Sequence, residues 1–449
     1  MKNPPAPGLV RNVTFPEIPA AQLDNGLTVL CVEDHHLPRT SVIVSLPIGR
    51  AHDPDDLRGV TQVMGEMLKE GTESRTSREI AEDLDHLAID FGCEVSMEQT
   101  ILSVTQLHPN LEEGLELLSD LMLRPAFPDE ELTKVKVRWH GHLVAQRSDP
   151  NFLASERLSL YWYEGHPYSK VSTPIEHLSN MTPERLRERH TDCFAPQSAS
   201  ILFAGPISLG ESVRLSQRFF SNWTGEAGID NGLPDVTTRR ERSVHLVHRP
   251  DSTQTRLLIG LTACSRLDQA YTQFKLANQI FGGGASSRYF LNLREDKGYT
   301  YGAYSSLKAY RQAGLLAAGA SVRTDVTSDA IKETFAEMEG MCSGPPEEQE
   351  LSRCKAEING AFVRGLESPS SIGSLELTRR ILGLPYDFYR SYIPAIEAVT
   401  PDQVSALSKR LFVPDEAAIV AVGDAAQISN ALEEFGPLAV YDQNGKSVG

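Results

Sequence analysis

The chain has 449 residues, of which 40% are hydrophobic and 23% are charged, and its formal net charge is −17. This length predicts two to three domains, and the composition is typical of a soluble globular protein with large cores. The negative charge argues against nucleic acid or an anionic membrane as the main partner, because both favour a basic protein surface. It is compatible with basic peptides or proteins as partners, although a solvated acidic surface is the simpler explanation.

The six cysteines are scattered along the chain and form no CxxC pair. We therefore expect buried free thiols rather than a disulfide framework or a cysteine-based zinc site. The first residues, MKNPPAPGLVRN, have no apolar core after Lys2, and no apolar run is long enough to span a bilayer. The sequence therefore predicts a cytoplasmic protein, or a periplasmic one if a signal peptide has been removed.

Taken in chain order, both halves begin with β-rich segments that precede a helix. In the first half these segments are 27–32 and 42–46, before a helix that begins at Gly59. In the second half they are 244–247 and 257–261, before a helix near Phe274. Each half is thus predicted to start with strands and to continue with helices.

The ends of the halves are related by an internal repeat. The segment MTPERLRERHTDCFAPQSASILFAG, from Met181, aligns without a gap with VTPDQVSALSKRLFVPDEAAIVAVG, from Val399. The alignment pairs Thr182 with Thr400, Pro183 with Pro401, Phe194 with Phe412, Pro196 with Pro414, Ile201 with Ile419 and Gly205 with Gly423. In each copy, Thr and Pro are typical of a helix N-cap and first helical position, and an apolar strand (201–204 or 418–422) follows a proline turn.

The duplication predicts two homologous α+β domains, 1–221 and 242–449, joined by a linker. The predicted linker is segment 222–241, NWTGEAGIDNGLPDVTTRRE, which is rich in Gly, Asn, Asp and Thr.

The helix that begins at Gly59, GVTQVMGEMLKEGT, is amphipathic. Its apolar residues recur with helical spacing at Val60, Val63, Met64, Met67 and Leu68, which predicts one buried stripe. We expect Gln62, Gly65 and Glu66 on the opposite face, toward solvent or a cleft, and Gly71 as the C-terminal cap.

This segment resembles the signature of the pitrilysin/insulinase metallopeptidases, which include the mitochondrial processing peptidases. Active members carry His-x-x-Glu-His in this frame: the two histidines bind zinc and the glutamate is the general base. The resemblance places Gln62 and Glu66 at the histidines and Gly65 at the base. The family's third ligand, a glutamate in a later helix, falls on His142. The family also implies the fold of each half, a mixed, mostly antiparallel sheet covered by helices.

These substitutions predict a degenerate zinc motif, with no metal and no cofactor in this chain. Gln62 is a neutral amide and Gly65 has no side chain, so a ligand and the base are both missing. Glu66 and His142 could hold a metal only weakly between them. The favoured alternative places His142 on the inner stripe of its helix, together with Leu132, Val135 and Trp139.

A segment of the second half, FGGGASSRYFLNLREDKGYTYGAYSSL from Phe281, resembles the family's C-terminal domain. In active members an Arg and a Tyr of this region reach the zinc site of another domain and hydrogen-bond the substrate. Arg294 and Tyr301 match that pair, with Tyr299 as a second candidate, and both side chains could stabilise an oxyanion. Alternatively, Arg294 and Glu295 form a surface ion pair and the tyrosines fill a strand.

Three consecutive glycines precede these donors. Gly282, Gly283 and Gly284 are not followed by a phosphate-binding motif, and a flexible loop over a substrate cleft is the better interpretation.

The resemblance implies the non-catalytic subunit of a heterodimeric zinc peptidase. Its partner would be a homologous subunit that carries the zinc and the base, and its substrates would be peptides. This chain would supply Arg294, Tyr301 and half of the peptide chamber, and would be inactive alone. The alternative is a structural or peptide-binding scaffold that forms a homo-oligomer.

Overall fold

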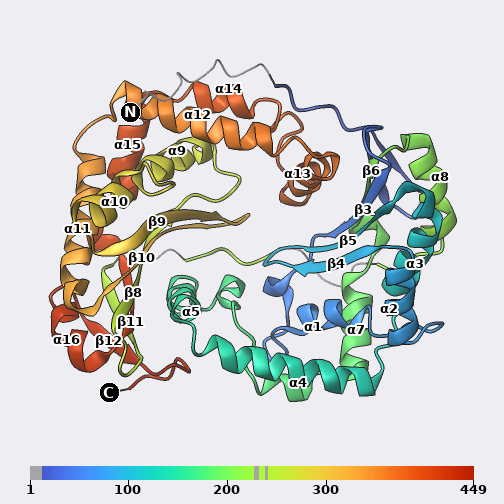
Figure 1. The fold of residues 1–449 in the computed structure, drawn as a ribbon, viewed down its shortest axis with the longest axis horizontal. Coiled ribbons are helices and arrows are strands. Elements are labelled where there is room, and N and C mark those ends of the chain that lie inside the picture. Colours follow the sequence, from blue (N-terminus) through green and yellow to red (C-terminus); the bar gives the residue numbers. More distant parts are fainter. Residues whose placement is uncertain (1–12, 227–231, 238–240, 449) are drawn as a thin grey trace.

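The computed structural model describes residues 13–226, 232–237 and 241–448. These residues form two six-stranded sheets, one in each half of the chain, both flanked by helices (Figure 1). The prediction of two α+β halves with mixed, mostly antiparallel sheets is therefore confirmed. Residues 1–12, on which the expectation about compartment rests, and parts of the predicted linker lie outside the described residues, so the domain boundaries stay a prediction. Among the helices that the structure describes, none is both long and apolar enough to cross a membrane.

The first sheet has the order β1-β2-β6-β3-β5-β4, in which only β2 and β6 are parallel. Its strands are β1 (Ala20–Gln22), β2 (Thr28–Glu33), β3 (Arg39–Leu46), β4 (Asp90–Val95), β5 (Thr100–Leu107) and β6 (Ser200–Gly205). The helices of this half are α1 (Val60–Met67), α2 (Ser77–His86), α3 (Leu111–Leu123), α4 (Asp129–Gln146), α5 (Pro150–Trp162), α6 (His177–Asn180), α7 (Pro183–Cys193) and α8 (Leu209–Phe220).

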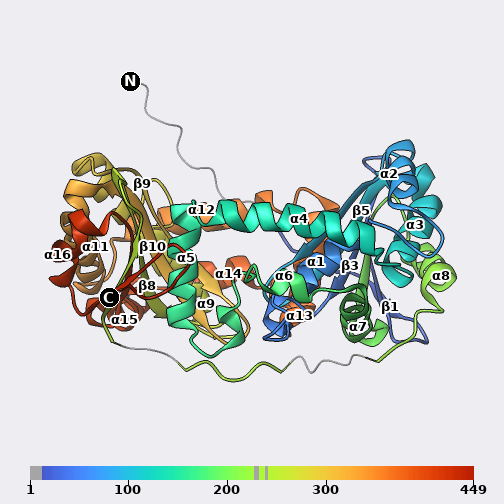
Figure 2. The ribbon, with the colours of Figure 1, turned by 90° about the horizontal axis from the view of Figure 1, so that it is seen from below.

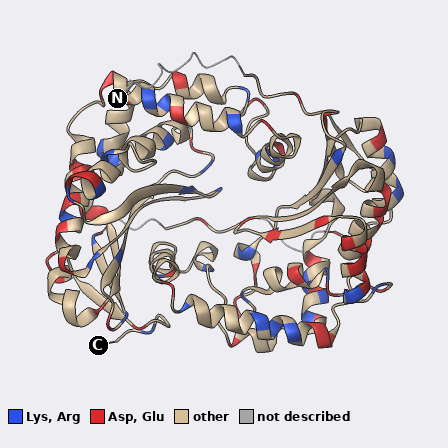
Figure 3. Ribbon diagram, viewed as in Figure 1, with Lys and Arg blue, Asp and Glu red and all other residues tan. Residues whose placement is uncertain are grey.

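The second sheet has the order β12-β7-β11-β8-β10-β9, with β7 parallel to both β11 and β12. Its strands are β7 (Ser243–His248), β8 (Gln254–Ala263), β9 (Thr300–Ala309), β10 (Gly314–Arg323), β11 (Ala418–Gly423) and β12 (Leu438–Tyr441). The helical elements are α9 (Tyr271–Phe281), α10 (Arg288–Phe290), the π-helical turn η5 (Leu291–Asp296), α11 (Thr327–Cys342), α12 (Glu348–Arg364), α13 (Pro369–Leu382), α14 (Tyr392–Glu397), α15 (Pro401–Leu411) and α16 (Ala425–Glu433). Figure 3 shows that charged residues of both signs lie mainly on the helices, whereas the sheets are largely uncharged.

The repeat extends to the register of the sheets. In the first sheet, Ile201 pairs with Val44, Val44 with Leu102, and Leu102 with Cys93. In the second sheet the corresponding row consists of Ile419, Ile259, Ala318 and Ser305. Because Ile201 and Ile419 are already equivalent in the sequence alignment, each residue of one row is the structural counterpart of a residue in the other. Cys93 and Ser305 are therefore equivalent positions.

The helix starts predicted from the repeat are observed. The hydroxyl of Thr182 accepts a hydrogen bond from the backbone N–H of Arg185 at 3.3 Å, and that of Thr400 accepts one from Gln403 at 3.2 Å. In both helices proline occupies the first turn, where its missing N–H costs nothing. The backbone therefore satisfies its free donors at these ends with the residues that the repeat preserves.

A buried ion pair anchors the N-terminus of α1. The carboxylate of Asp53 accepts from the N–H of Gly59 at 2.8 Å and lies 3.3 Å from the guanidinium of Arg189. Burial raises the pKa of Asp53, while the charge of Arg189 opposes that rise. The helix ends at Met67, four residues before Gly71, so the prediction that Gly71 caps it is wrong. Gly71 instead has a φ of +144° and packs against Pro128.

The two halves exchange one helix each. Helix α5 of the first half packs on β7, β8 and β11 of the second sheet, where Leu153, Ala154 and Leu158 are buried against Leu258 and Val420. Helix α13 of the second half packs on β2, β3 and β6 of the first sheet, where Leu377 is buried with Leu30, Ile43 and Leu202. We call α5 and α13 the exchanged helices (Figure 1). Each sheet is thus completed by a helix from the other half.

The tips of two hairpins form a second contact between the halves. Glu98, in the turn between β4 and β5, accepts hydrogen bonds from the backbone N–H of Arg311, between β9 and β10, at 3.1 and 3.2 Å. The hydroxyl of Tyr168 donates to the same carboxylate at 2.6 Å. Residues 232–237 of the predicted linker run beside this contact (Figure 2), and the imidazole of His166 lies 2.8 Å from the carbonyl of Pro234. These bonds join the two halves at the hairpin tips.

Glycines allow the exchanged helices to approach the sheets closely. A Cβ atom on Gly373 of α13 would lie 2.0 Å from a methyl carbon of Leu202, whose side chain is fully buried. A Cβ atom on Gly260 of β8 would lie 2.7 Å from a methyl carbon of Leu158 on α5. A glycine at each contact therefore sets the helix-to-sheet distance.

We expect Gly373→Ala to destabilise the protein, although alanine favours a helix over glycine by up to about 1 kcal/mol. The added methyl overpacks the contact with Leu202, which costs about 1–3 kcal/mol. The matched control is Gly141→Ala on α4, because a Cβ there meets nothing within 4 Å and the helix should gain stability. The midpoint of urea unfolding should fall for the first variant and rise or stay level for the second, and equal midpoints would contradict a close packing of α13.

Candidate functional site

The apolar stripe of α1 is buried as predicted. All five of its side chains are fully buried, namely those of Val60, Val63, Met64, Met67 and Leu68. The opposite face lines a small pocket of about 260 Å³ with Gln62, Gly65 and Glu66. Cys93 from β4 and Trp139 from α4 close the other sides of this pocket. The three motif positions are thus brought together.

Gly65, at the position of the catalytic base, is covered by β4. The residue is buried, and a Cβ atom on it would lie 2.7 Å from the sulfur of Cys93. Burial raises the pKa of the Cys93 thiol to about 12, so this sulfur is a neutral packing atom. Gly65 lines the pocket, as expected for the outer face of α1, but the sulfur of Cys93 occupies the space that the side chain of the family's base would need.

Glu66, at the second histidine position, is bound to protein partners from α4. Its carboxylate lies 2.8 Å from the guanidinium of Arg138 and accepts a hydrogen bond from the indole N–H of Trp139 at 2.6 Å. Arg138 also contacts Glu70 at 3.0 Å. Both oxygens of Glu66 are therefore occupied by donors that satisfy its charge.

His142, at the position of the third ligand, is exposed on α4. Its imidazole lies 2.9 Å from the side-chain amide of Gln146, and its ring centre lies 6.5 Å from that of Trp139. The interpretation of His142 as part of the inner stripe is wrong, because Leu143 rather than His142 continues the buried row of Leu132 and Val135.

The motif positions do not fit a zinc ion. Within the described ranges, no three His, Cys, Asp or Glu side chains are grouped so that they could hold a metal. Gln62 offers an amide oxygen, and Glu66 already neutralises Arg138. A catalytic tetrahedral zinc site needs three protein ligands, and the side chains of this pocket do not provide them.

Arg294 lies in the π-helical turn η5, an element that occurs frequently at functional sites. Its guanidinium lies 5.1 Å from the ring centre of Phe290, and its Nε is 3.5 Å from the carboxylate of Glu295. Both charged side chains are about half exposed, so this ion pair contributes little stability. The guanidinium remains accessible to another group.

Tyr301 is 92% exposed, and a β-bulge explains why. Thr300 pairs with Val322 and Ala303 with Ala320, so two residues of β9 lie opposite the single residue Ser321. Without the extra residue Tyr301 would point to the same face as Ala303, which is buried. The bulge therefore directs this phenol outward.

Local residues stabilise the bulge. The hydroxyl of Thr300 accepts from the N–H of Gly302 at 3.2 Å and donates to its carbonyl at 3.0 Å. Tyr299, the second candidate, is partly buried and packs against the core of the second half. The interpretation as filler therefore applies to Tyr299, whereas Tyr301 is free of packing constraints.

One exposed aromatic residue of this region was not predicted from the sequence. Tyr304 is half exposed, and its ring centre lies 5.2 Å from that of Phe290, the ring beneath Arg294. The alternation along β9 would place Tyr304 opposite Tyr301, and only the bulge puts both on the exposed side. Arg294, Tyr301 and Tyr304 thus form a polar aromatic surface at the start of β9.

The three glycines lie at the end of α9, against β9. The carbonyl of Gly282 accepts from the N–H of Ser305 at 2.7 Å, and a Cβ atom on Gly282 would lie 2.4 Å from the hydroxyl of that serine. Gly283 is packed against Gln279, while Gly284 has more space. Close packing thus explains Gly282 and Gly283, and substrate contact by this loop stays a prediction.

The two sets of predicted site residues lie in opposite halves. Figure 1 shows α1 beside the first sheet and α10, which leads directly into η5, at the far side of the second. Arg294 and Tyr301 are therefore not directed at the degenerate motif of their own chain.

Two family models match the chain. The model described as insulinase (peptidase family M16) matches residues 28–171, and that described as peptidase M16 inactive domain matches residues 180–358. An uncharacterized zinc protease of Bacillus subtilis is 25% identical over 88% of this chain and 95% of its own length. One of Mycobacterium leprae is 25% identical over 87% of this chain and 88% of its own length.

Solved structures share the fold. A peptidase M16 inactive domain from Pseudomonas fluorescens aligns with a TM-score of 0.84 and 23% identity, covering 91% of this chain and 98% of its own. A protease from Helicobacter pylori aligns with a TM-score of 0.79 and 16% identity, covering 91% of this chain and all of its own.

A double-mutant cycle tests whether Cys93 excludes a side chain at Gly65. Gly65→Ala alone should destabilise the protein by about 1–3 kcal/mol, because the methyl overlaps the sulfur. Cys93→Ala removes that atom and leaves the new methyl in ordinary contact with Cγ2 of Val95 at 3.5 Å and with the Cβ at position 93 at 3.8 Å. The double variant should therefore lose less than the sum of the two single losses. Urea unfolding of all four proteins measures the coupling, and strictly additive losses would show that the contact does not restrict Gly65.

Proposed function

Because the chain belongs to the pitrilysin/insulinase (M16) peptidase family but lacks the zinc ligands and the base, we propose that it is the non-catalytic subunit of a heterodimeric zinc peptidase. A homologous partner subunit supplies the zinc and the general base. This chain supplies Arg294 and Tyr301 as donors to the peptide and forms half of the chamber around it.

The exposure of Tyr301 is the observation that carries this proposal. A phenol that is 92% exposed is unusual for a large aromatic side chain, and a bulge with its own hydrogen bonds holds it there. The chain's own motif helix lies in the other half, so in this proposal the donor acts at a site that another chain brings to it. In such a pair this chain keeps the donors that the peptide needs, and its own zinc motif can be lost because the partner carries one.

The chemistry of the two donors suits peptide hydrolysis. When water attacks the scissile carbonyl, negative charge develops on its oxygen, and donors held in place stabilise that charge without reorganisation. The guanidinium of Arg294 presents several N–H groups in a fixed plane, and the phenol of Tyr301 provides one O–H. Zinc in the partner subunit would supply the activation of the attacking water, while Arg294 and Tyr301 orient the peptide.

The edge strand β9 offers the peptide a second kind of contact. Among the described residues, β10 is the only strand beside it, so outer backbone groups other than the N–H of Ser305, which donates to Gly282, can pair with an extended peptide. Arg294, Tyr301 and this edge lie at the same end of β9, which places backbone pairing next to the donors.

Arg294→Ala and Tyr301→Phe should each lower kcat of the pair by about 10²- to 10³-fold, because each removes one donor to the oxyanion. The pair is reconstituted from this chain and the homologous zinc-bearing subunit of the same organism, and cleavage of a fluorogenic peptide is measured. Tyr299→Phe is the matched control, since that ring packs in the core, and its kcat should stay within about twofold of the wild type.

Assembly is followed in the same samples by analytical ultracentrifugation. Normal assembly with slow turnover supports the donor role. Unchanged turnover in both variants contradicts it, and a homodimer of this chain that captures no zinc-bearing subunit favours a scaffold instead.

A further inference from the structure

The second half contains a counterpart of the degenerate zinc motif. Gly65 contacts Cys93, and at the equivalent position of the repeat the hydroxyl of Ser305 donates to the side chain of Asn278 on α9 at 2.8 Å. Asn278 therefore corresponds to Gly65. When α9 is aligned with α1 on this pair, Gln279 corresponds to Glu66 and Lys275 corresponds to Gln62.

The neighbouring helices confirm this frame. Glu66 is bound by Arg138 of α4, and Gln279 donates to Glu357 of α12 at 2.8 Å. Helices α4 and α12 are equivalent in the order of elements, and each provides the partner of the second motif position. Both halves thus build the same kind of site from α1 and α4, or from α9 and α12.

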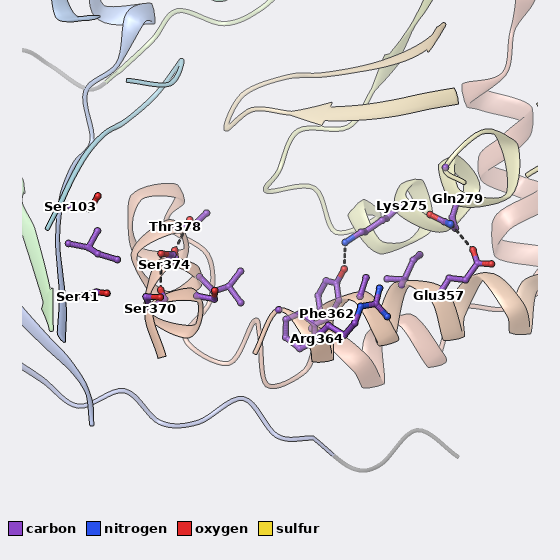
Figure 4. Close-up of a pocket in the computed structure, with 18 of the residues that line it drawn as sticks. Ser41, Ser103, Lys275, Gln279, Glu357, Phe362, Arg364, Ser370, Ser374 and Thr378 are labelled. Atoms are coloured by element: carbon purple, nitrogen blue, oxygen red, sulfur yellow. Dashed lines mark hydrogen bonds between the residues drawn. The ribbon is translucent and has the colours of Figure 1, made fainter. Parts of the chain in front are cut away.

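The two counterparts differ greatly in size. The first-half pocket measures about 260 Å³ and is closed by Trp139 and Cys93. The second-half pocket measures about 940 Å³ and opens between α9, α12, the exchanged helix α13 and the face of the first sheet (Figure 4). Hydroxyl groups line the side opposite α9, namely those of Ser41, Ser103, Thr105, Ser370, Ser374 and Thr378.

The charges of this pocket are unbalanced. Its cations are Lys275 and Arg364, and neither forms an ion pair with a carboxylate of the described residues. Its one carboxylate, Glu357, accepts from Gln279 at 2.8 Å and from Ser286 at 3.0 Å. The cations therefore remain available to an anion, whereas the carboxylate is already satisfied.

Lys275 is placed in surroundings that favour an incoming anion. Its ammonium donates to the hydroxyl of Tyr392 and lies 4.9 Å from the centre of that ring. Burial, with a smaller effect of the charge on Arg266, lowers the pKa of Lys275 to about 8. A carboxylate in the pocket would compensate for both effects, because an opposite charge nearby stabilises the ammonium.

We propose that this pocket binds a carboxylate group of a peptide through Lys275 and Arg364. The hydroxyl-lined wall then surrounds the residues next to that group. This inference rests on the proposed peptide chamber, which supplies the class of ligand. A carboxylate reaches the pocket either as the C-terminus of a peptide, such as a cleavage product, or as an Asp or Glu side chain. Because the net charge of the protein is −17, its surface as a whole does not attract acidic chains. The cationic pocket therefore binds a carboxylate at one defined place.

Binding is measured on the full chain alone by isothermal titration calorimetry. The probes are N-acetyl-trialanine with a free carboxylate, the same peptide as its amide, and the amide of N-acetyl-Ala-Glu-Ala. We expect at least one acid-bearing probe to bind and the trialanine amide not to bind. Preference for the first probe identifies a chain end, and preference for the third identifies an acidic side chain.

Lys275→Met should weaken binding of the preferred probe by about tenfold or more, because one charge-assisted contact is lost. Arg364→Gln provides a second variant at an exposed position that leaves the fold intact, and it should weaken binding in the same direction. Lys332→Met is the matched control, since it removes one positive charge on α11, where Lys332 pairs with Glu434 at 3.0 Å. Equal binding of the acid and the amide, no binding of either acid, or unchanged affinity in both pocket variants would overturn the proposal.

These measurements involve no cleavage and no partner subunit. Loss of binding in the pocket variants with normal turnover would separate this site from the donors Arg294 and Tyr301. If instead the probe binds as expected but Arg294→Ala and Tyr301→Phe do not change turnover, the pocket is established and the donor role in the peptidase is contradicted.

Discussion

The exchange of α5 and α13 between the two sheets is the constraint on which the rest of the structure depends. Each sheet has one apolar face that a helix from the other half helps to cover, so each half depends on the other for part of its core. Gly373 and Gly260 set the distances of these contacts. The exchange therefore makes the two repeats one unit and fixes where the pocket between them lies.

The loss of the zinc motif is a rearrangement of neighbours rather than three isolated substitutions. The sulfur of Cys93 fills the space above Gly65, and Arg138 and Trp139 take both oxygens of Glu66. The side chain of Glu66 is 30% exposed, and the cation and the indole of α4 stabilise its carboxylate where an active family member would hold a metal. The helix keeps its buried stripe and its anchor at Asp53, which explains why the fold survives the change.

Local signals in the sequence predicted much of the fold and of the site. The Thr-Pro pairs at Thr182 and Thr400 identified two helix starts, because capping depends on residues close in sequence. The periodicity of α1 identified its buried face for the same reason. The position of His142 was missed because α4 has a weak amphipathic pattern and Leu143 takes the core side. The bulge at Tyr301, the cover that Cys93 places over Gly65 and the exchanged helices depend on contacts between distant segments, which no local pattern encodes.

Duplication explains why one fold can lose a site and gain another. The two halves place equivalent residues on α1 and α9, and the same frame carries Glu66 with Arg138 in one half and Gln279 with Glu357 in the other. In the first half the ion pair and Trp139 fill the site, whereas in the second half the neutral Gln279 leaves Lys275 and Arg364 without acidic partners. The two sites thus differ both in size and in the charge of the residues that line them. Because the exchanged helix α13 and the first sheet complete the walls of the open site, its shape depends on both halves, and it could not form in a single repeat.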